Sequence, residues 1–128
     1  MDSCLFPPNS TQPTNATENE SKTLLLGPFC GKPACQFIRA KKGGGVCADA
    51  YRSRETLVVP DVEAYPGHIA CDGDTRSEIV LPMKLKGESE DIILGVMDLD
   101  SVVLAAFGDE DAKGLQRIVD TTVAMSKW

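Results

Sequence analysis

Two neighbouring strand patterns joined by a short turn are the feature that most constrains how this chain can fold. In Ser77–Leu85 the apolar side chains recur at every second position from Ile79 onward, which is the period of a half-buried strand. Residues 87–90 then provide a hairpin-like turn. The next strand pattern, Asp91–Asp100, is apolar on both faces over most of its length. Together these segments predict an antiparallel hairpin.

Carboxylates continue one apolar face of the second strand. On this face the apolar residues are followed by Asp98 and Asp100, and Glu78 interrupts the preceding strand. A carboxylate beside apolar positions is costly unless a cation meets it, and a ligand amine would serve. The alternative is that Asp98 and Asp100 reach solvent and cap the following turn. The apolar residues of this face are Ile92, Leu94 and Val96.

The remaining patterns predict three further strands and two helices. The strands are Thr23–Leu26, which Gly27-Pro28 should end, a segment around Cys35–Ile38, and Leu57–Val59. The helices are Val46–Arg52, behind a glycine run, and an amphipathic segment from Asp109 onward. Residues 60–76 read as a long ordered loop. An antiparallel meander with helices packed on one side gives an α+β fold.

A chain of 128 residues is sufficient for one domain. Residues 1–22 are dominated by Pro, Ser, Thr and Asn, with almost no apolar residue after Phe6. Such a segment can bury little to offset the entropy of ordering it, so we expect a flexible polar arm. The ordered domain should therefore comprise residues 23–128.

Charge and hydropathy exclude several partners. The chain has 19 acidic and 13 basic residues and a net charge of −6, which argues against nucleic acid because phosphates are contacted chiefly by Lys and Arg. No apolar run is long enough to span a membrane, and the first twenty residues lack the apolar region of a signal peptide. We therefore expect a cytoplasmic protein that binds neither nucleic acid nor membrane.

The five cysteines are an odd number in a domain large enough to fold without disulfides, so a structural disulfide framework is disfavoured. Cys30 and Cys35 are spaced too widely for a zinc knuckle or a thioredoxin-type dithiol. No four-ligand metal set appears, and no metal or cofactor is predicted. Cys4 lies in the predicted arm and is interpreted as incidental.

Two cysteines are candidates for chemistry. Cys47 lies at the predicted N-terminus of a helix, near Lys41 and Lys42, where the helix dipole and positive charge favour a thiolate. The alternative is that Cys47 packs as a small buried hydrophobe. Cys71 lies in the long loop, three residues from the only histidine, His68, which could hold a thiolate or could simply be solvated.

Six segments taken in order resemble the GAF-type free methionine-(R)-sulfoxide reductases. They are LGPFCGKPAC, GGGVCADAY, VPDVEAYPGHIACD, SEIVLPMKLKG, GVMDLDS and FGDEDAKGL, and the similarity runs from about Leu24 to Trp128. Cys35, Cys47 and Cys71 match the family's three cysteines, whereas Cys30 is peculiar to this chain.

The resemblance implies a six-stranded antiparallel sheet, a homodimer and a closed pocket for one free amino acid. By matched position, Glu78, Asp98 and Asp100 would bind the substrate ammonium and help protonate the departing oxygen. Cys71 would be the nucleophile and Cys35 the resolving thiol, with Cys47 an auxiliary that could equally be the attacker. A thioredoxin-like protein would reduce the resulting disulfide.

One departure from the family lies at the N-terminus. The relatives begin with helices and a first strand that carries an aromatic Trp-Gly-Phe-Tyr stretch, and here only the polar arm stands in that place. We therefore expect the first strand and the N-terminal helices to be missing. Two other functions follow as alternatives: a noncatalytic GAF module that senses a small ligand, and a simple thiol redox switch.

Overall fold

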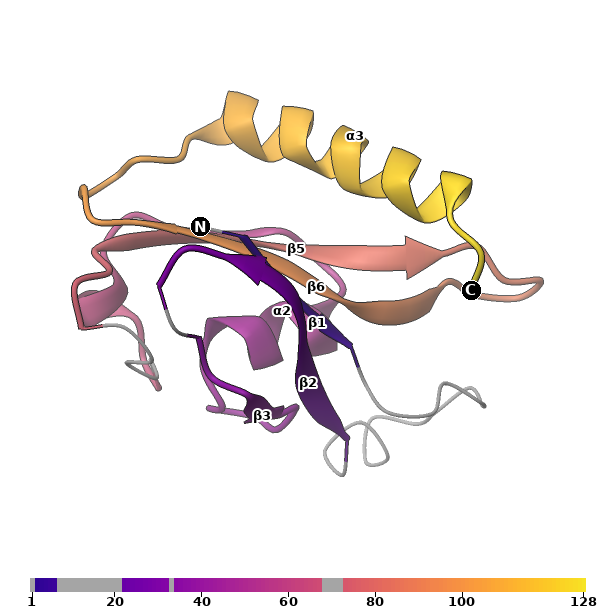
Figure 1. The fold of residues 1–128 in the computed structure, drawn as a ribbon, viewed down its shortest axis with the longest axis horizontal. Helices are drawn as coiled ribbons and strands as arrows, with labels where there is room; N and C mark the ends of the chain where they lie inside the picture. Colours follow the sequence, from indigo (N-terminus) through magenta and orange to yellow (C-terminus); the bar gives the residue numbers. More distant parts are fainter. Residues whose placement is uncertain (1, 7–21, 33, 68–72) are drawn as a thin grey trace.

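The computed structural model describes residues 2–6, 22–32, 34–67 and 73–128. Its strands form one antiparallel sheet in the order β3-β2-β1-β6-β5-β4, which confirms the predicted α+β class (Figure 1). The strands are β1 (Asp2–Phe6), β2 (Thr23–Cys30), β3 (Phe37–Arg39), β4 (Leu57–Val59), β5 (Ser77–Leu85) and β6 (Ile92–Ser101). The helices are α2 (Val46–Ser53), a short 3-10 helix (Val62–Ala64) and α3 (Asp109–Met125).

A β-bulge in the hairpin of β5 and β6 decides which side chains share a face. Met83 pairs with Gly95 and Lys84 pairs with Ile93, so Leu94 is the extra residue. As a result Leu94 packs in the same core as Ile79 and Leu81, whereas Val96 packs in the opposite core. The prediction that Leu94 and Val96 share one face with Asp98 and Asp100 is therefore wrong for Leu94, because the bulge reverses the alternation.

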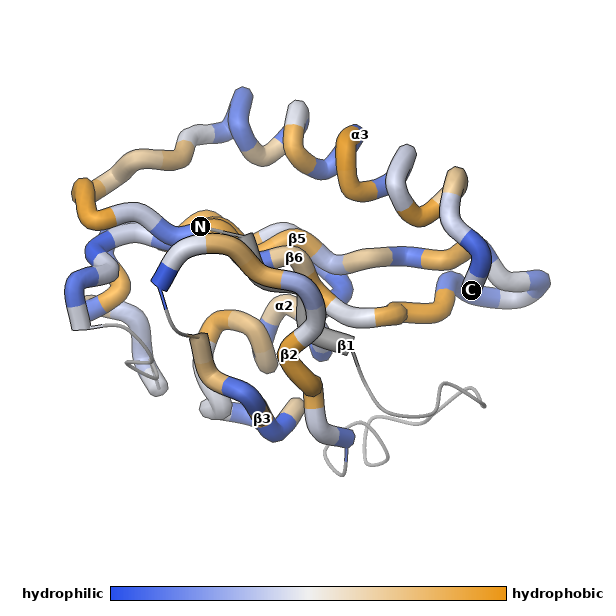
Figure 2. Tube along the Cα trace, in the orientation of Figure 1, coloured by the Kyte–Doolittle hydropathy of each residue, from blue (hydrophilic) through white to orange (hydrophobic). Residues whose placement is uncertain are grey.

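The sheet is covered on both faces, so the prediction that the helices pack on one side is wrong. In Figure 1, α3 lies over one face of β5 and β6, and α2 lies against the other. Val119 and Val123 of α3 pack with Ile79, whereas Ala48 of α2 packs with Val80. The physical reason is that β5 and β6 are apolar on both faces, and both faces need cover. Figure 2 colours long stretches of these two strands as hydrophobic.

The prediction that order begins at Thr23 and that the first strand is missing is also wrong. Strand β1 lies inside the sheet and pairs with β2 on one side and with β6 on the other. Cys4 is therefore part of a strand. Hydrogen bonds on both edges can order a short backbone segment whatever its composition, which is why composition alone was misleading here. Residues 7–21 of the predicted arm lie outside the described part.

Strand β2 does not end at Gly27-Pro28 but continues to Cys30. The pairing of β1 with β2 shifts between Ser3 and Leu5, opposite this dipeptide, so an irregularity in the ladder accommodates the proline. The predictions for Leu57–Val59 and for a helix from Asp109 are confirmed, as is a helix that begins at Val46. Among the described residues, neither helix combines the length and apolar character that a membrane span requires.

Candidate functional site

Three elements bring a thiol and two carboxyl groups together. Cys47 is in the first turn of α2, Glu78 is in β5 and Asp98 is in β6. The Cys47 thiol donates a hydrogen bond to Asp98 Oδ2 at 3.4 Å. One ligand atom from each of the three residues lies within 4.8 Å of the other two. Both Cys47, at 5% exposed, and Glu78, at 7%, are buried.

The register of the hairpin explains why these acids share one face. Glu78 is paired with Asp100 across the two strands, and Asp98 is paired with Val80. Glu78 and Asp98 are thus diagonal neighbours, close enough for the hydrogen bond between them. Asp98 accepts a hydrogen bond from Cys47 and does not act as a solvent-facing cap. The structure therefore favours a shared acidic site over the alternative of carboxylates that merely end a strand.

Burial and neighbouring negative charge keep protons on this site. Burial raises the pKa of Glu78 to about 10, and the charges of Asp98 and Asp100 act in the same direction. At neutral pH Glu78 is therefore a carboxylic acid that can donate a proton. The ordinary pKa of a glutamate, 4.5, would leave it ionised.

The prediction that the position of Cys47 at the start of a helix favours its thiolate form is wrong. Burial raises the pKa of the Cys47 thiol, and Asp98, Glu78 and Asp100 raise it further. Lys41 and Lys42 lie exposed before the helix. The helix dipole acts only over the first turn and is worth little beside desolvation and three acidic neighbours. Cys47 is therefore a protonated thiol at neutral pH.

Tyr65, which the sequence interpretation did not single out, lies beside this site. Its hydroxyl donates to Asp49 Oδ2 at 2.6 Å and so ties the loop after β4 to α2. Burial, this hydrogen bond and the charges of Asp49 and Glu78 raise the pKa of Tyr65 to about 12. The signal available in the sequence was its place in a long loop that also carries a cysteine.

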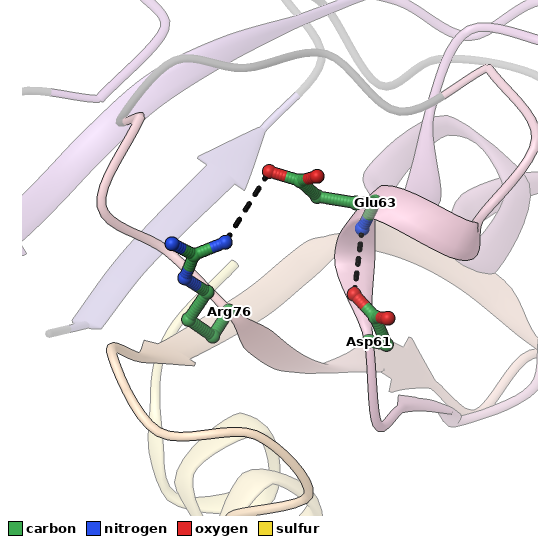
Figure 3. A network of polar contacts seen from close by, with 3 residues as sticks. All are labelled: Asp61, Glu63 and Arg76. Carbon is green, nitrogen blue, oxygen red and sulfur yellow. Dashed lines mark hydrogen bonds and ion pairs between the residues drawn. The ribbon is translucent and has the colours of Figure 1, made fainter.

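The same loop is held at further points. Gly67 has a φ of 75°, and a Cβ at this position would lie 2.7 Å from the carbonyl oxygen of Gly43. Figure 3 shows a polar network in which Arg76 contacts Glu63 at 3.4 Å and the Glu63 amide donates to Asp61 Oδ1 at 3.1 Å. These contacts order both ends of the loop.

The structure describes the bonding state of three cysteines, of which two are free and one is in a disulfide. Cys30 is free and exposed, and Cys47 is free and buried. Cys35 is half-buried and disulfide-bonded. Cys71 and His68 lie outside the described residues. The predicted roles of Cys71 and of the His68 contact therefore stay predictions.

An ion pair joins the segments that contain two of the predicted reactive cysteines. Lys32 Nζ lies 2.5 Å from Asp74 Oδ2. Lys32 is three residues before Cys35, and Asp74 is three residues after Cys71. Two loops that are distant in sequence are thus held side by side at these positions.

Within the described ranges, the group that could hold a metal ion consists of Cys47, Glu78 and Asp98. It offers one sulfur and two carboxyl ligands from three elements. The sequence interpretation did not find this set because its members lie 31 and 20 positions apart in the chain. Spacing within a motif cannot reveal ligands that only strand pairing brings together.

Comparison with known proteins places the chain among relatives of known fold. The model of the GAF domain matches residues 18–123. The chain is 47% identical over 100 residues to the free methionine-R-sulfoxide reductase of Saccharomyces cerevisiae, covering 78% of this chain and 53% of the yeast protein. It is 50% identical over 103 residues to GAF domain-containing protein A of Dictyostelium discoideum, covering 80% of this chain and 60% of that protein.

A solved structure agrees with these sequence matches. The X-ray structure of the free methionine-R-sulfoxide reductase from Neisseria meningitidis, in complex with its substrate, superimposes with a TM-score of 0.74 at 35% identity. The match covers 96% of this chain and 65% of that one. The chain thus spans between about half and two thirds of the length of these relatives. Sequence and fold agree that the chain belongs to the GAF domain family.

Proposed function

We propose that this protein reduces free methionine-(R)-sulfoxide to methionine. The observation that carries the proposal is the buried convergence of Cys47, Glu78 and Asp98, with Asp100 paired to Glu78. A buried set of acidic groups suits a zwitterionic guest whose ammonium offsets their charge. Relatives named for this activity, including one solved with its substrate, support the choice of guest.

In the proposed complex the carboxyl groups have two roles. Asp98 and Asp100 accept hydrogen bonds from the substrate ammonium. Glu78 donates a proton to the sulfoxide oxygen, and the raised pKa that burial gives this acid supports that role. Protonation makes the sulfoxide sulfur electrophilic and weakens its bond to oxygen, so that the oxygen can pass to the attacking cysteine sulfur.

The proposed redox chemistry uses two thiols. The Cys71 thiolate attacks the sulfoxide sulfur, methionine leaves, and the oxygen stays on Cys71 as a sulfenic acid. The sulfoxide sulfur is thereby reduced by two electrons and the Cys71 sulfur is oxidised by two. The Cys35 thiol then displaces water and forms a Cys35–Cys71 disulfide. The disulfide state of Cys35 and the Lys32–Asp74 ion pair between the flanking segments support this pairing.

Cys47 has an auxiliary role in this proposal. Its buried, protonated thiol is a poor nucleophile, which supports Cys71 as the attacker. Its hydrogen bond to Asp98 would hold that carboxylate toward the substrate. A thioredoxin-like reductant, a homodimer and a cytoplasmic location stay predictions from the resemblance and from the sequence.

The test is turnover of the two sulfoxide epimers by the whole chain. Free L-methionine-(R)-sulfoxide should be consumed with a thioredoxin system, while the (S) epimer is not, as chromatography of released methionine will measure. Cys71→Ser should abolish turnover, and Glu78→Gln should lower it by about a hundredfold. Cys30→Ser is the matched control and should leave turnover unchanged. Absence of turnover by folded protein would contradict the proposal.

A noncatalytic sensory module is the second candidate. It is favoured by the likeness to a GAF domain-containing protein whose name states no activity, at 50% identity. Calorimetry would then show ligand binding without formation of a disulfide. A third possibility, a thiol switch, requires peroxide to oxidise Cys35 and Cys71 as readily as the sulfoxide does. Sulfoxide-dependent oxidation of Cys71 would reject both.

A further inference from the structure

We propose that Cys47, Glu78 and Asp98 form a binding site for a divalent cation of the zinc class. The three side chains offer one sulfur and two oxygen ligand atoms, all within 4.8 Å of one another. Thiolate and carboxylate together suit Zn²⁺ and Co²⁺, whereas Mg²⁺ and Ca²⁺ take oxygen ligands alone. The site would therefore select a cation with affinity for sulfur.

The geometry of one ligand pair already fits a tetrahedral ion. Ligands at about 2.3 Å for sulfur and about 2.0 Å for oxygen lie about 3.5 Å apart on a tetrahedron. Cys47 Sγ and Asp98 Oδ2 are 3.4 Å apart. The ion would replace the thiol proton of Cys47 between these atoms and the carboxyl proton of Glu78, and both protons would pass to solvent. Neither α2 nor β6 has to move.

The surroundings of the site favour a cation and hold its ligands in place. Cys47 and Glu78 are each more than nine-tenths buried. The titratable groups that act on the Cys47 thiol are Asp98, Glu78 and Asp100, and all of them are acidic. Bringing acidic groups together out of water is costly, and a divalent cation offsets that cost. Three protein ligands leave a fourth position for water or a small molecule.

The cation site uses groups of the proposed substrate site, so a bound ion and the substrate ammonium would exclude one another. Zinc would then inhibit sulfoxide reduction in competition with the substrate. Binding of the ion itself does not depend on reductase activity.

The experiment titrates the whole reduced chain with Co²⁺ after treatment with a chelator. We expect saturation at one equivalent, with a sulfur-to-cobalt charge-transfer band that Zn²⁺ then removes by displacing cobalt. Cys47→Ser should abolish the band, and Asp98→Asn should weaken cobalt binding at least tenfold. Cys30→Ser is the matched control, since Cys30 is also free but exposed, and it should bind as the unmodified chain does.

Persistence of the band in folded Cys47→Ser protein, or its loss in Cys30→Ser, would overturn the proposal. If Cys47→Ser does not fold, as circular dichroism will show, Cys47→Ala and Asp98→Asn decide the question. A chain that binds cobalt but fails to turn over sulfoxide refutes the proposed function alone. A chain that turns over sulfoxide but binds no cobalt refutes the cation site alone.

Discussion

Lys32 and Asp74, which are 42 positions apart, form an ion pair with 2.5 Å between Nζ and Oδ2. The pair holds the segment before Cys35 against the segment after Cys71. Hydrogen bonding to Lys32 and its charge lower the pKa of Asp74, so the carboxylate stays ionised at neutral pH. A disulfide between the two segments needs this proximity, because exchange requires direct contact between sulfur atoms.

Removing the ion pair should slow formation of the proposed Cys35–Cys71 disulfide. Because both partners are largely exposed, we expect Lys32→Ala to slow oxidation only about two- to fivefold, and high salt to reduce the difference. Mass spectrometry of quenched samples measures the rate. Glu90→Gln, which breaks the exposed pair with Arg54, is the control and should oxidise at the normal rate. A rate that is equal in Lys32→Ala would show that the pair does not align the segments.

Glu78→Gln should change how stability depends on pH. Folded Glu78 keeps its proton up to about pH 10, whereas an unfolded glutamate loses it near 4.5. The folded state binds more protons between these values, so the unfolding free energy falls as pH rises, by at most about 1.4 kcal/mol per pH unit. Gln cannot ionise, so the Glu78→Gln variant does not lose this part of its unfolding free energy as the pH rises.

The stability of Glu78→Gln relative to the unmodified chain should therefore increase steadily from acid to alkaline pH. Urea unfolding across that range measures the effect. Glu88→Gln, at an exposed position, is the control for loss of a carboxyl group outside the site. A flat difference for Glu78→Gln would mean that Glu78 does not hold its proton in the folded state.

Cys30 and Cys47, the free cysteines among the described side chains, should differ in reactivity. The pKa of buried Cys47 is raised, so iodoacetamide should alkylate it at least about tenfold more slowly than exposed Cys30 in the native reduced chain. A time course of peptide mass spectrometry measures both sites at once. In denaturant the two rates should converge. Rapid alkylation of native Cys47 would restore it as a candidate nucleophile.

Gly67→Ala should destabilise the loop after β4. The added Cβ would lie 2.7 Å from the Gly43 carbonyl oxygen at a residue with positive φ, so we expect a loss of about 1–3 kcal/mol. Thermal unfolding should show a midpoint several degrees lower. Gly73→Ala is the control, because nothing lies within 4 Å of a Cβ there. Equal stability of the two variants would contradict the close contact between Gly67 and Gly43.

Local patterns were sufficient for several elements. The alternation in Ser77–Leu85 predicted β5, and the helical period after Asp109 predicted α3. Each periodicity lies within one continuous stretch of sequence, so it can be recognised without coordinates. The resemblance of ordered motifs also identified the family. Glu78 and Asp98 could be singled out because an acid within an apolar strand pattern is visible without coordinates.

What only the tertiary structure decided depends on distant segments. The central place of β1 comes from backbone pairing with β2 and β6. A bulge at Leu94 determines which face carries Asp98. Burial, together with three acids from the hairpin, raises the pKa of Cys47 and so reverses the charge state that the helix position suggested. Sequence periodicity indicates which face of its own helix or strand each side chain occupies. Register, burial and electric field arise only when elements meet, and these set the chemistry of the site.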